Sequence, residues 1–280
     1  KINLKNSELL LDFLNYEKKE NLDSLILIKG NFKKNNPVKF DLISLVEKNN
    51  KILFKNLNLN KDFKIIDINS FNLNYLNNNN VQNKLFLKRD NANYFIEGEN
   101  FDATKLIRSI NNNDKKEMSL FSNFNSKINL KIKKTYIDKV NFINNLSGKI
   151  NFKNDKINNL DLKGFFSNNK IINLSIKTNN QKEQITKLYT DYPKPLIERY
   201  NFIKGLEEGY LDYYSIKKDE ISNSLLIIDD FKVKEVPVFA KILSLASLQG
   251  IADLLTGEGI RFTDFEMKFS NTKGLTTIEE

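Results

Sequence analysis

The sequence predicts a mainly β fold, in which many short strands form an elongated antiparallel meander. Three observations predict it. Apolar and polar residues alternate with a period of two in several runs, which is typical of strands with one apolar and one solvated face. Polar clusters rich in Asn, Ser and Gly separate these runs at intervals of roughly ten residues, as the turns of a meander do. Only one long apolar run, residues 237–255, has the length of a substantial helix.

Three segments show the alternation most clearly, and their apolar residues are the candidate lining of a binding face. These residues are Ile128, Leu130 and Ile132, then Ile172, Leu174 and Ile176, and finally Phe265, Met267 and Phe269. Weaker alternation runs through residues 57–59, 150–152 and 160–162. Turns are predicted at residues 49–50, 77–80, 111–114, 147–148, 168–169 and 179–180.

Helices are predicted at three places. Asp102 is placed to cap a short helix over residues 104–110, and Pro193 or Pro195 to open another through Ile197. The longest helix runs over residues 237–255, with Pro237 in its first turn and Gly257 as its stop.

The helix 237–255 is apolar nearly all round, but only the 11 residues 242–252 separate Lys241 from Asp253. A bilayer needs roughly 18–20 apolar residues, so this helix is too short to cross one. Burial against a sheet is the simpler interpretation. The sharper one is a helix that gates the end of an apolar groove or touches a membrane surface, through Phe239, Ile242, Leu245 and Leu248.

The composition excludes much catalytic chemistry. The chain contains no His, no Cys and no Trp, so a Ser-His-Asp triad, a thiol nucleophile or a standard zinc site cannot be built from it. The glycines form neither a dinucleotide-binding nor a phosphate-loop motif. Adjacent carboxylates such as Asp229 and Asp230 point to opposite faces of a strand and cannot share a proton or a metal. We therefore expect no enzyme activity, no cofactor and no metal.

The net charge of +9, from 44 basic and 35 acidic residues, raises the question of nucleic-acid binding. Only Arg89, Arg108, Arg199 and Arg261 are arginines, although phosphate and base recognition favours the forked guanidinium. The lysines are not interleaved with regularly spaced aromatic residues, as a stacking platform requires. We expect no nucleic-acid partner. A lysine-mediated anion or nucleic-acid binder stays the third interpretation, and it predicts affinity that falls steeply with salt.

The predicted strands leave an apolar face that the few helices cannot cover. A sandwich or closed barrel, in which the sheet covers itself, is one solution. A sheet curled into an open trough that accepts acyl chains is the other, because lipid tails bind by the apolar area removed from water and need no polar motif.

The C-terminal third resembles the AsmA-like family, in particular its YhdP and TamB type of bridge-like lipid transfer proteins. The resemblance covers roughly residues 190–275. It consists of a strand ending in Asp230-Phe231, the helix opened by Pro237 with small residues at 244, 246, 247 and 250, the run Gly257-Glu258-Gly259-Ile260 and the aromatic Phe262. Residues 195–211 look like the helix and strand that precede this block. Residues 1–190 resemble the family only in their general pattern, a repetitive β meander.

The resemblance implies a β-taco, a β sheet curled into an open hydrophobic groove, made of a repetitive β segment (1–190) and a C-terminal block (191–280). It implies non-enzymatic phospholipid transport between the inner and outer membranes of a diderm bacterium. The chain is then a periplasmic segment of an inner-membrane-anchored cell-envelope protein of outer-membrane biogenesis, with its anchor outside this sequence. Phospholipid acyl chains, a membrane surface and other envelope proteins are the implied partners. The alternative is a structural or assembly-factor scaffold with a self-closed core.

Overall fold

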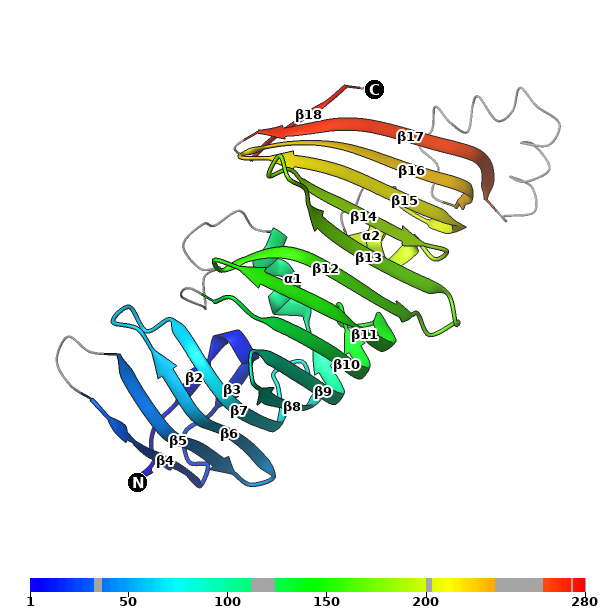
Figure 1. The fold of residues 1–280 in the computed structure, drawn as a ribbon. Helices are drawn as coiled ribbons and strands as arrows, with labels where there is room; N and C mark the ends of the chain where they lie inside the picture. The colour runs from blue at the N-terminus through cyan, green and yellow to red at the C-terminus, as the bar shows by residue number, and fades with distance from the viewer. Residues whose placement is uncertain (33–36, 112–123, 200–202, 235–258, 273, 280) are drawn as a thin grey trace. The chain divides into compact units, whose positions relative to one another are not determined.

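A computed structural model of the chain describes residues 1–32, 37–111, 124–199, 203–234, 259–272 and 274–279 (Figure 1). These residues form a mainly β structure with one mixed sheet of 16 strands and a separate two-stranded ribbon. The predicted fold class is therefore confirmed at the level of a mainly β protein with few, short helices. The predicted helix 237–255, with Phe239, Ile242, Leu245 and Leu248, lies outside the described residues.

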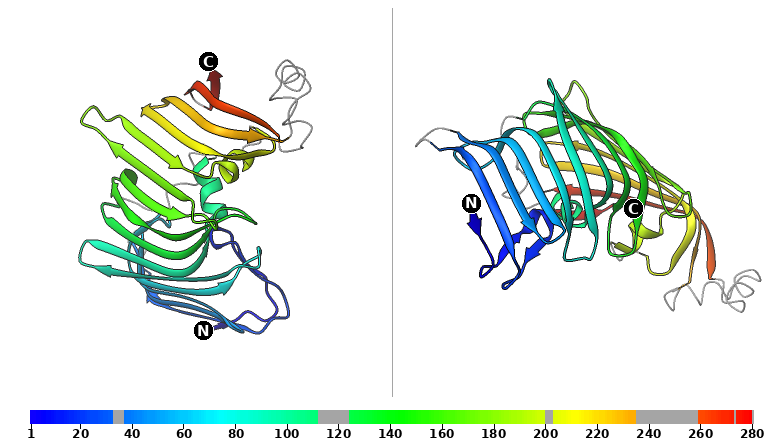
Figure 2. Two further views of the ribbon diagram at one scale, coloured as in Figure 1. Left: turned by 90° about the vertical axis from the view of Figure 1, so that its right-hand side faces the viewer. Right: turned by 90° about the horizontal axis from the view of Figure 1, so that it is seen from below.

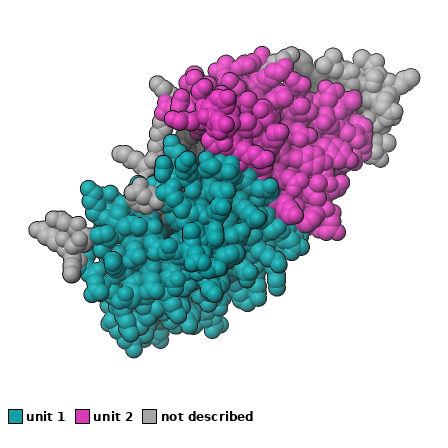
Figure 3. Space-filling view, in the orientation of Figure 1, with its two compact units in different colours: residues 1–162 teal, residues 163–280 magenta. Residues whose placement is uncertain are grey.

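The chain divides into two compact units, residues 1–162 and 163–280 (Figure 3). The predicted division into segments 1–190 and 191–280 rests on sequence style and family resemblance, and stays a prediction. Unit 1 contains β1 (Ile2–Asn3), β2 (Leu9–Leu11), η1 (Asp12–Leu14), β3 (Tyr16–Lys18), β4 (Ser24–Asn31), β5 (Val38–Glu47), β6 (Asn50–Leu59), β7 (Ile65–Leu76), β8 (Gln82–Asp90), β9 (Asn93–Asp102), α1 (Thr104–Asn111), β10 (Lys127–Tyr136) and β11 (Phe142–Lys153).

The boundary between the units falls within β12 (Lys156–Phe165). Unit 2 continues with β13 (Ile171–Thr178), β14 (Gln184–Thr190), α2 (Lys194–Arg199), β15 (Leu206–Lys218), β16 (Ile221–Val233), β17 (Ile260–Thr272) and β18 (Leu275–Ile278). The three segments with the clearest alternation are strands β10, β13 and β17, as predicted.

One strand pair corrects the predicted antiparallel meander. β9 and β10 run parallel, with Tyr94 opposite Ile128 and Ile96 opposite Leu130. A tight turn cannot join parallel strands, because the chain must return to the end of the sheet where the first strand began. Between β9 and β10 lie residues 103–126, of which the structure describes 103–111, with α1, and 124–126. Alternation in a sequence shows that a strand is present but not its direction, so the parallel pairing could not be predicted from it.

The two short helices begin where their capping residues predicted. The Thr104 main-chain N–H donates to Asp102 Oδ1 over 2.9 Å at the start of α1. In α2, the N–H groups of Leu196 and Ile197 both donate to the Pro193 carbonyl oxygen over 3.0 Å.

The predicted turn at Ser147–Gly148 is wrong, because both residues lie inside β11. Gly148 has φ of +157°, and a Cβ atom there would lie 1.9 Å from the carbonyl oxygen of Asp161. The backbone of β12 thus approaches β11 too closely for a side chain, which is a common reason for glycine within a strand.

Several strands contain a residue in the left-handed region at their interior. Asn56 in β6 has φ of +48°, Asn145 in β11 has +50° and Asp230 in β16 has +48°. Such a residue breaks the alternation, so the same face is reached after an odd number of residues. Ile52 and Leu57 of β6 are accordingly both buried on one face, as are Leu206 and Leu211 of β15, where Gly209 has φ of +87°.

Candidate functional site

The apolar face of unit 1 carries two rows of side chains that run across the strands, each residue opposite the next. The first row consists of Leu45, Ile52, Leu73, Leu85 and Ile132, with Gly98 between the last two. The middle row lies beside it and consists of Ile43, Phe54, Phe71, Leu87, Ile96 and Leu130. No member of either row is charged.

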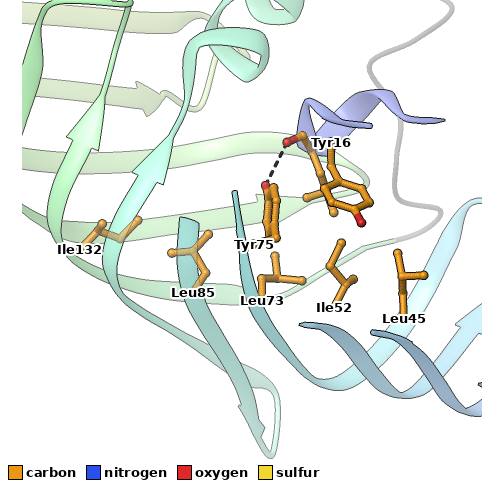
Figure 4. Packing of buried hydrophobic residues seen from close by; sticks show 8 residues of the cluster. Tyr16, Leu45, Ile52, Leu73, Tyr75, Leu85 and Ile132 are labelled. Carbon is orange, nitrogen blue, oxygen red and sulfur yellow. Dashed lines mark hydrogen bonds between the residues drawn. The ribbon is translucent and has the colours of Figure 1, made fainter. Parts of the chain in front are cut away.

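The N-terminal segment covers the first row. β2, η1 and β3 leave the edge of the sheet and lie over the face of the neighbouring strands (Figure 2). Tyr16 packs with its ring edge-on to Tyr75, at 5.7 Å between ring centroids, and Leu14 joins the same cluster (Figure 4). All five apolar residues of the first row are buried as a result.

A second cluster covers the other side of the middle row. Phe124 lies 5.4 Å between ring centroids from both Tyr94 and Phe152. It buries a group of residues that consists of Leu57, Ile68, Leu87, Tyr94 and Ile128. Leu87 belongs to this cluster as well as to the middle row, which explains why it is buried.

The middle row of unit 1 is less buried than the groups on either side of it. Ile43, Phe54, Phe71, Ile96 and Leu130 are all partly exposed, although they lie between two buried groups. Apolar residues in the middle of an apolar face are ordinarily its most buried part, so a row there that is partly exposed on both sides of Leu87 is an unusual surface.

Unit 2 also carries a row of partly exposed side chains across its strands. Its middle row consists of Leu174, Leu188, Tyr213, Leu226 and Met267, one residue from each of the strands β13 to β17. All of them are partly exposed. One flanking row consists of Ile172, Thr190, Leu211, Ile228 and Phe265, and the other of Ile176, Thr186, Ser215, Ser224 and Phe269.

Short local contacts bury most of the first flanking row of unit 2 and the centre of the second. Phe265 of the first row and Ile176, Thr186 and Phe269 of the second are partly exposed. Ile197 of α2 packs in one cluster with Leu211 and Ile228. On the other side, the Ser224 hydroxyl donates to Ser215 Oγ over 2.9 Å, and Tyr213 Oη lies 3.2 Å from Ser224 Oγ. These hydroxyl groups satisfy one another, so their burial carries little free-energy cost.

The nine sequence-predicted lining residues all lie on these faces, but in different places, whereas the predicted gating residues lie outside the described part of the chain. Leu130 belongs to the middle row of unit 1, and Leu174 and Met267 to the middle row of unit 2. Ile128 and Ile132 lie in the buried groups of unit 1. The remaining four, Ile172, Ile176, Phe265 and Phe269, lie in the flanking rows of unit 2.

Sequence reasoning missed most of the two middle rows. Ile43 and Phe54 stand in strands where apolar residues occupy both faces, so period two is weak there. Phe71 begins a run of strict alternation, residues 71–75, which could have revealed it. Leu226 stands in the run 225–228, in which every residue is apolar. Only the strand register, which a single sequence does not contain, places these residues side by side.

Charged residues cluster on the face of unit 2 that lies opposite its middle row. Arg261 donates to Asp230, and its Nη2 lies 2.8 Å from Glu208 Oε2. Hydrogen bonding to Asp230, and then to Glu208, raises the pKa of the Arg261 guanidinium. Burial, together with the nearby Asp229, raises the pKa of Asp212 on the same face. A hollow of about 310 Å³ near Glu208 and Asp230 also opens on this charged side.

In the described part of the chain, no group of three or more carboxylates is arranged to hold a metal ion. Nor does any helix in that part combine the length and apolarity that crossing a membrane requires. Comparisons of the chain with protein-family models, curated proteins and solved structures find no match.

Proposed function

We propose that this chain is a non-enzymatic lipid conduit, which carries phospholipid acyl chains along an open hydrophobic groove between the inner and outer membranes of a diderm bacterium. The observation that carries the proposal is an apolar middle row in each unit, partly exposed at every position except Leu87. In unit 1 this row lies between two buried groups. The resemblance of residues 190–275 to the AsmA-like family points the same way. The curled groove and a gating helix over residues 237–255 belong to this proposal.

The physical chemistry of the rows suits a hydrocarbon chain. The middle row of unit 2 crosses five strands, β13 to β17. Neighbouring strands lie ~4.8 Å apart, so such a row is roughly 19 Å long. Each buried CH₂ group contributes about 0.8 kcal/mol, without any polar contact. An acyl chain along the row therefore gains binding free energy at every strand while no single residue fixes its position, as sliding requires.

A self-closed scaffold is the second candidate, and a specific observation favours it. In unit 1 the chain's own N-terminal segment and Phe124 cover the rows on both sides of the middle row. If the middle rows serve only as sheet packing, charge placed there destabilises the fold but affects no transfer.

The test places one carboxylate in each middle row, with Leu130→Asp and Leu174→Asp combined in one variant. Transfer of fluorescent phospholipid from donor to acceptor vesicles is measured. We expect transfer to fall to background, because a charge in an apolar path is costly to desolvate. The matched control is Lys131→Asp with Asn173→Asp, exposed neighbours on the opposite face of the same two strands.

Circular dichroism compares the strand content of both variants with that of the wild type. Transfer at the wild-type rate by a folded Leu130→Asp, Leu174→Asp variant refutes the conduit. Equal losses in the test and control variants also refute it, because the effect then does not depend on the face.

A further inference from the structure

We propose that residues 9–18 are a displaceable plug, which occupies the first row of unit 1 and gives way when acyl chains enter there. This inference rests on the proposed lipid function and concerns its regulation. The plug consists of β2, η1 and β3, and its apolar side faces Leu45, Ile52 and Leu73 of the first row (Figure 4).

The topology allows the plug to leave without breaking the sheet. β1 pairs with β4 through Ile2 opposite Ile26 and Asn3 opposite Leu25. β2 and β3 pair only with each other, in their own two-stranded ribbon. Residues 4–23 are therefore an excursion between two adjacent strands of the large sheet. Lifting the excursion removes none of the hydrogen bonds that join the strands of that sheet.

The base of the excursion, which includes Lys18 at the end of the plug, is fixed more firmly than the tip formed by residues 9–17. The fully buried Lys18 donates from Nζ to the carbonyl oxygens of Leu4, Lys5 and Ser7, the last over 2.6 Å. In addition, the Leu4 N–H donates to the Ser24 carbonyl oxygen over 3.0 Å. A fixed base lets the tip lift off the sheet and return to the same position.

A few polar contacts hold the tip on the face. Tyr16 donates its hydroxyl to Glu47, and Tyr75 donates to the Leu14 carbonyl oxygen over 3.0 Å. Outside them, Asp12 forms an exposed ion pair with Lys105 of α1. Exposed ion pairs contribute little to stability. The tip is therefore held by the two buried hydrogen bonds and by its packing on the same apolar row that an acyl chain would occupy.

The outer side of the tip is also apolar. Leu10 and Phe13 are 61% and 57% exposed, although each lies next to residues packed on the sheet. A tip with apolar residues on both sides loses less by leaving the row when a lipid surface is present to receive it. The plug is thus poised between the row and a membrane surface.

The experiment fixes the tip of the plug to α1 with a crosslink. The chain has no cysteine, so Asp12→Cys with Lys105→Cys introduces the only two thiols, at exposed positions that already pair. A short bis-maleimide links them and holds the plug on the row. The matched control is the same variant with each thiol capped by N-ethylmaleimide. Circular dichroism verifies that both forms are folded.

Lipid is detected at two positions with the photocrosslinker benzoylphenylalanine. One probe replaces Ile52 under the plug, and the other replaces Leu174 in the middle row of unit 2. Each protein is irradiated with vesicles of phosphatidylethanolamine and phosphatidylglycerol that contain radiolabelled phospholipid. We expect Leu174 to capture lipid in both forms, and Ile52 to capture it only in the capped form.

The outcomes distinguish failure of the plug proposal from failure of the conduit proposal. Capture at Leu174, together with equal or absent capture at Ile52 in both forms, overturns the plug and leaves the conduit standing. Absence of capture at both positions overturns both proposals.

A second measurement needs no probe in the core. The Asn78 N–H donates to the Asn15 carbonyl oxygen on the plug over 2.9 Å. Vesicles are expected to speed hydrogen exchange at Asn78 in the capped form but not in the linked form. Unchanged exchange in the capped form counts against the plug.

Discussion

The Asp102 carboxylate joins three parts of unit 1, so its removal is a sharp test of how the structure is held together. Its Oδ1 accepts the Thr104 N–H at the start of α1. Its Oδ2 accepts the side-chain amides of Asn77 and Asn79, over 2.8 and 2.7 Å, from the turn between β7 and β8. One side chain thus both caps a helix and fixes a turn.

The expected loss follows from these bonds. In Asp102→Ala, loss of the helix cap costs about 1 kcal/mol. The amide of Asn77, which is 4% exposed, is left without this partner at a cost of about 1–3 kcal/mol. Asn79 is partly exposed and can bond to water. We therefore expect Asp102→Ala to lower the free energy of unfolding by about 2–4 kcal/mol.

Asp102→Asn separates the two roles. Its Oδ1 can still cap α1, because Asn is as good a cap as Asp. Its NH₂ group faces the two donor amides in place of Oδ2, so the link to the turn is lost. We expect an intermediate loss of stability in this variant.

The pH dependence has a definite sign. Burial raises the pKa of Asp102, but hydrogen bonds from Thr104, Asn79 and Asn77 outweigh it and hold the pKa below the ordinary value. The stabilisation is therefore complete above the unfolded-state pKa of about 3.9 and is lost as the pH falls through the folded pKa. The difference between the wild type and Asp102→Ala should shrink on acidification.

Urea unfolding followed by circular dichroism measures these differences. With a slope of about 1–3 kcal/mol per molar urea, a loss of about 3 kcal/mol moves the midpoint by roughly 1 M or more. Hydrogen exchange at Thr104 provides a local readout of the cap. Asp90→Ala, at the exposed end of β8, is the control. An Asp102→Ala variant within about 0.5 kcal/mol of that control would refute the reasoning.

Two further predictions concern packing in each unit. Gly148→Ala should destabilise unit 1 by about 1–3 kcal/mol or more, because its Cβ would lie 1.9 Å from the Asp161 oxygen. Gly274→Ala, where no atom lies within 4 Å but φ is +87°, should cost only about 1–2 kcal/mol; equal losses would contradict the close approach. Ile228→Ala, at a fully buried position, should cost about 2–5 kcal/mol in thermal or urea unfolding. Ile227→Ala, on the partly exposed opposite face, should cost clearly less, and the reverse order would contradict the assigned faces.

The elements that the sequence predicted are those whose signal is local. The strands β10, β13 and β17 follow from alternation, and the start of α1 follows from the capping side chain of Asp102. Both signals involve only residues near each other in the chain, and no distant partner overrides them.

Features that depend on distant neighbours could not be predicted. Ser147 and Gly148 are residue types common in turns, but Gly148 lies in a strand and allows the backbone of β12 to approach closely. Left-handed residues such as Asn56 shift the inward face by one residue in mid-strand, which conceals the rows from a search for strict alternation. The plug is also concealed, because the sequence 9–18 does not state which face it will cover.

The parallel pair β9 and β10 has a consequence for the order in which the chain folds. Most neighbouring strands, such as β5 with β6, β7 with β8 and β15 with β16, are joined by short turns, so they form as local hairpins with little loss of loop entropy. The parallel pair, like β16 with β17, joins strands that are far apart in the sequence, so its closure costs more loop entropy. We expect this junction to be a late step, at which two already assembled hairpin arrays are joined into one ladder.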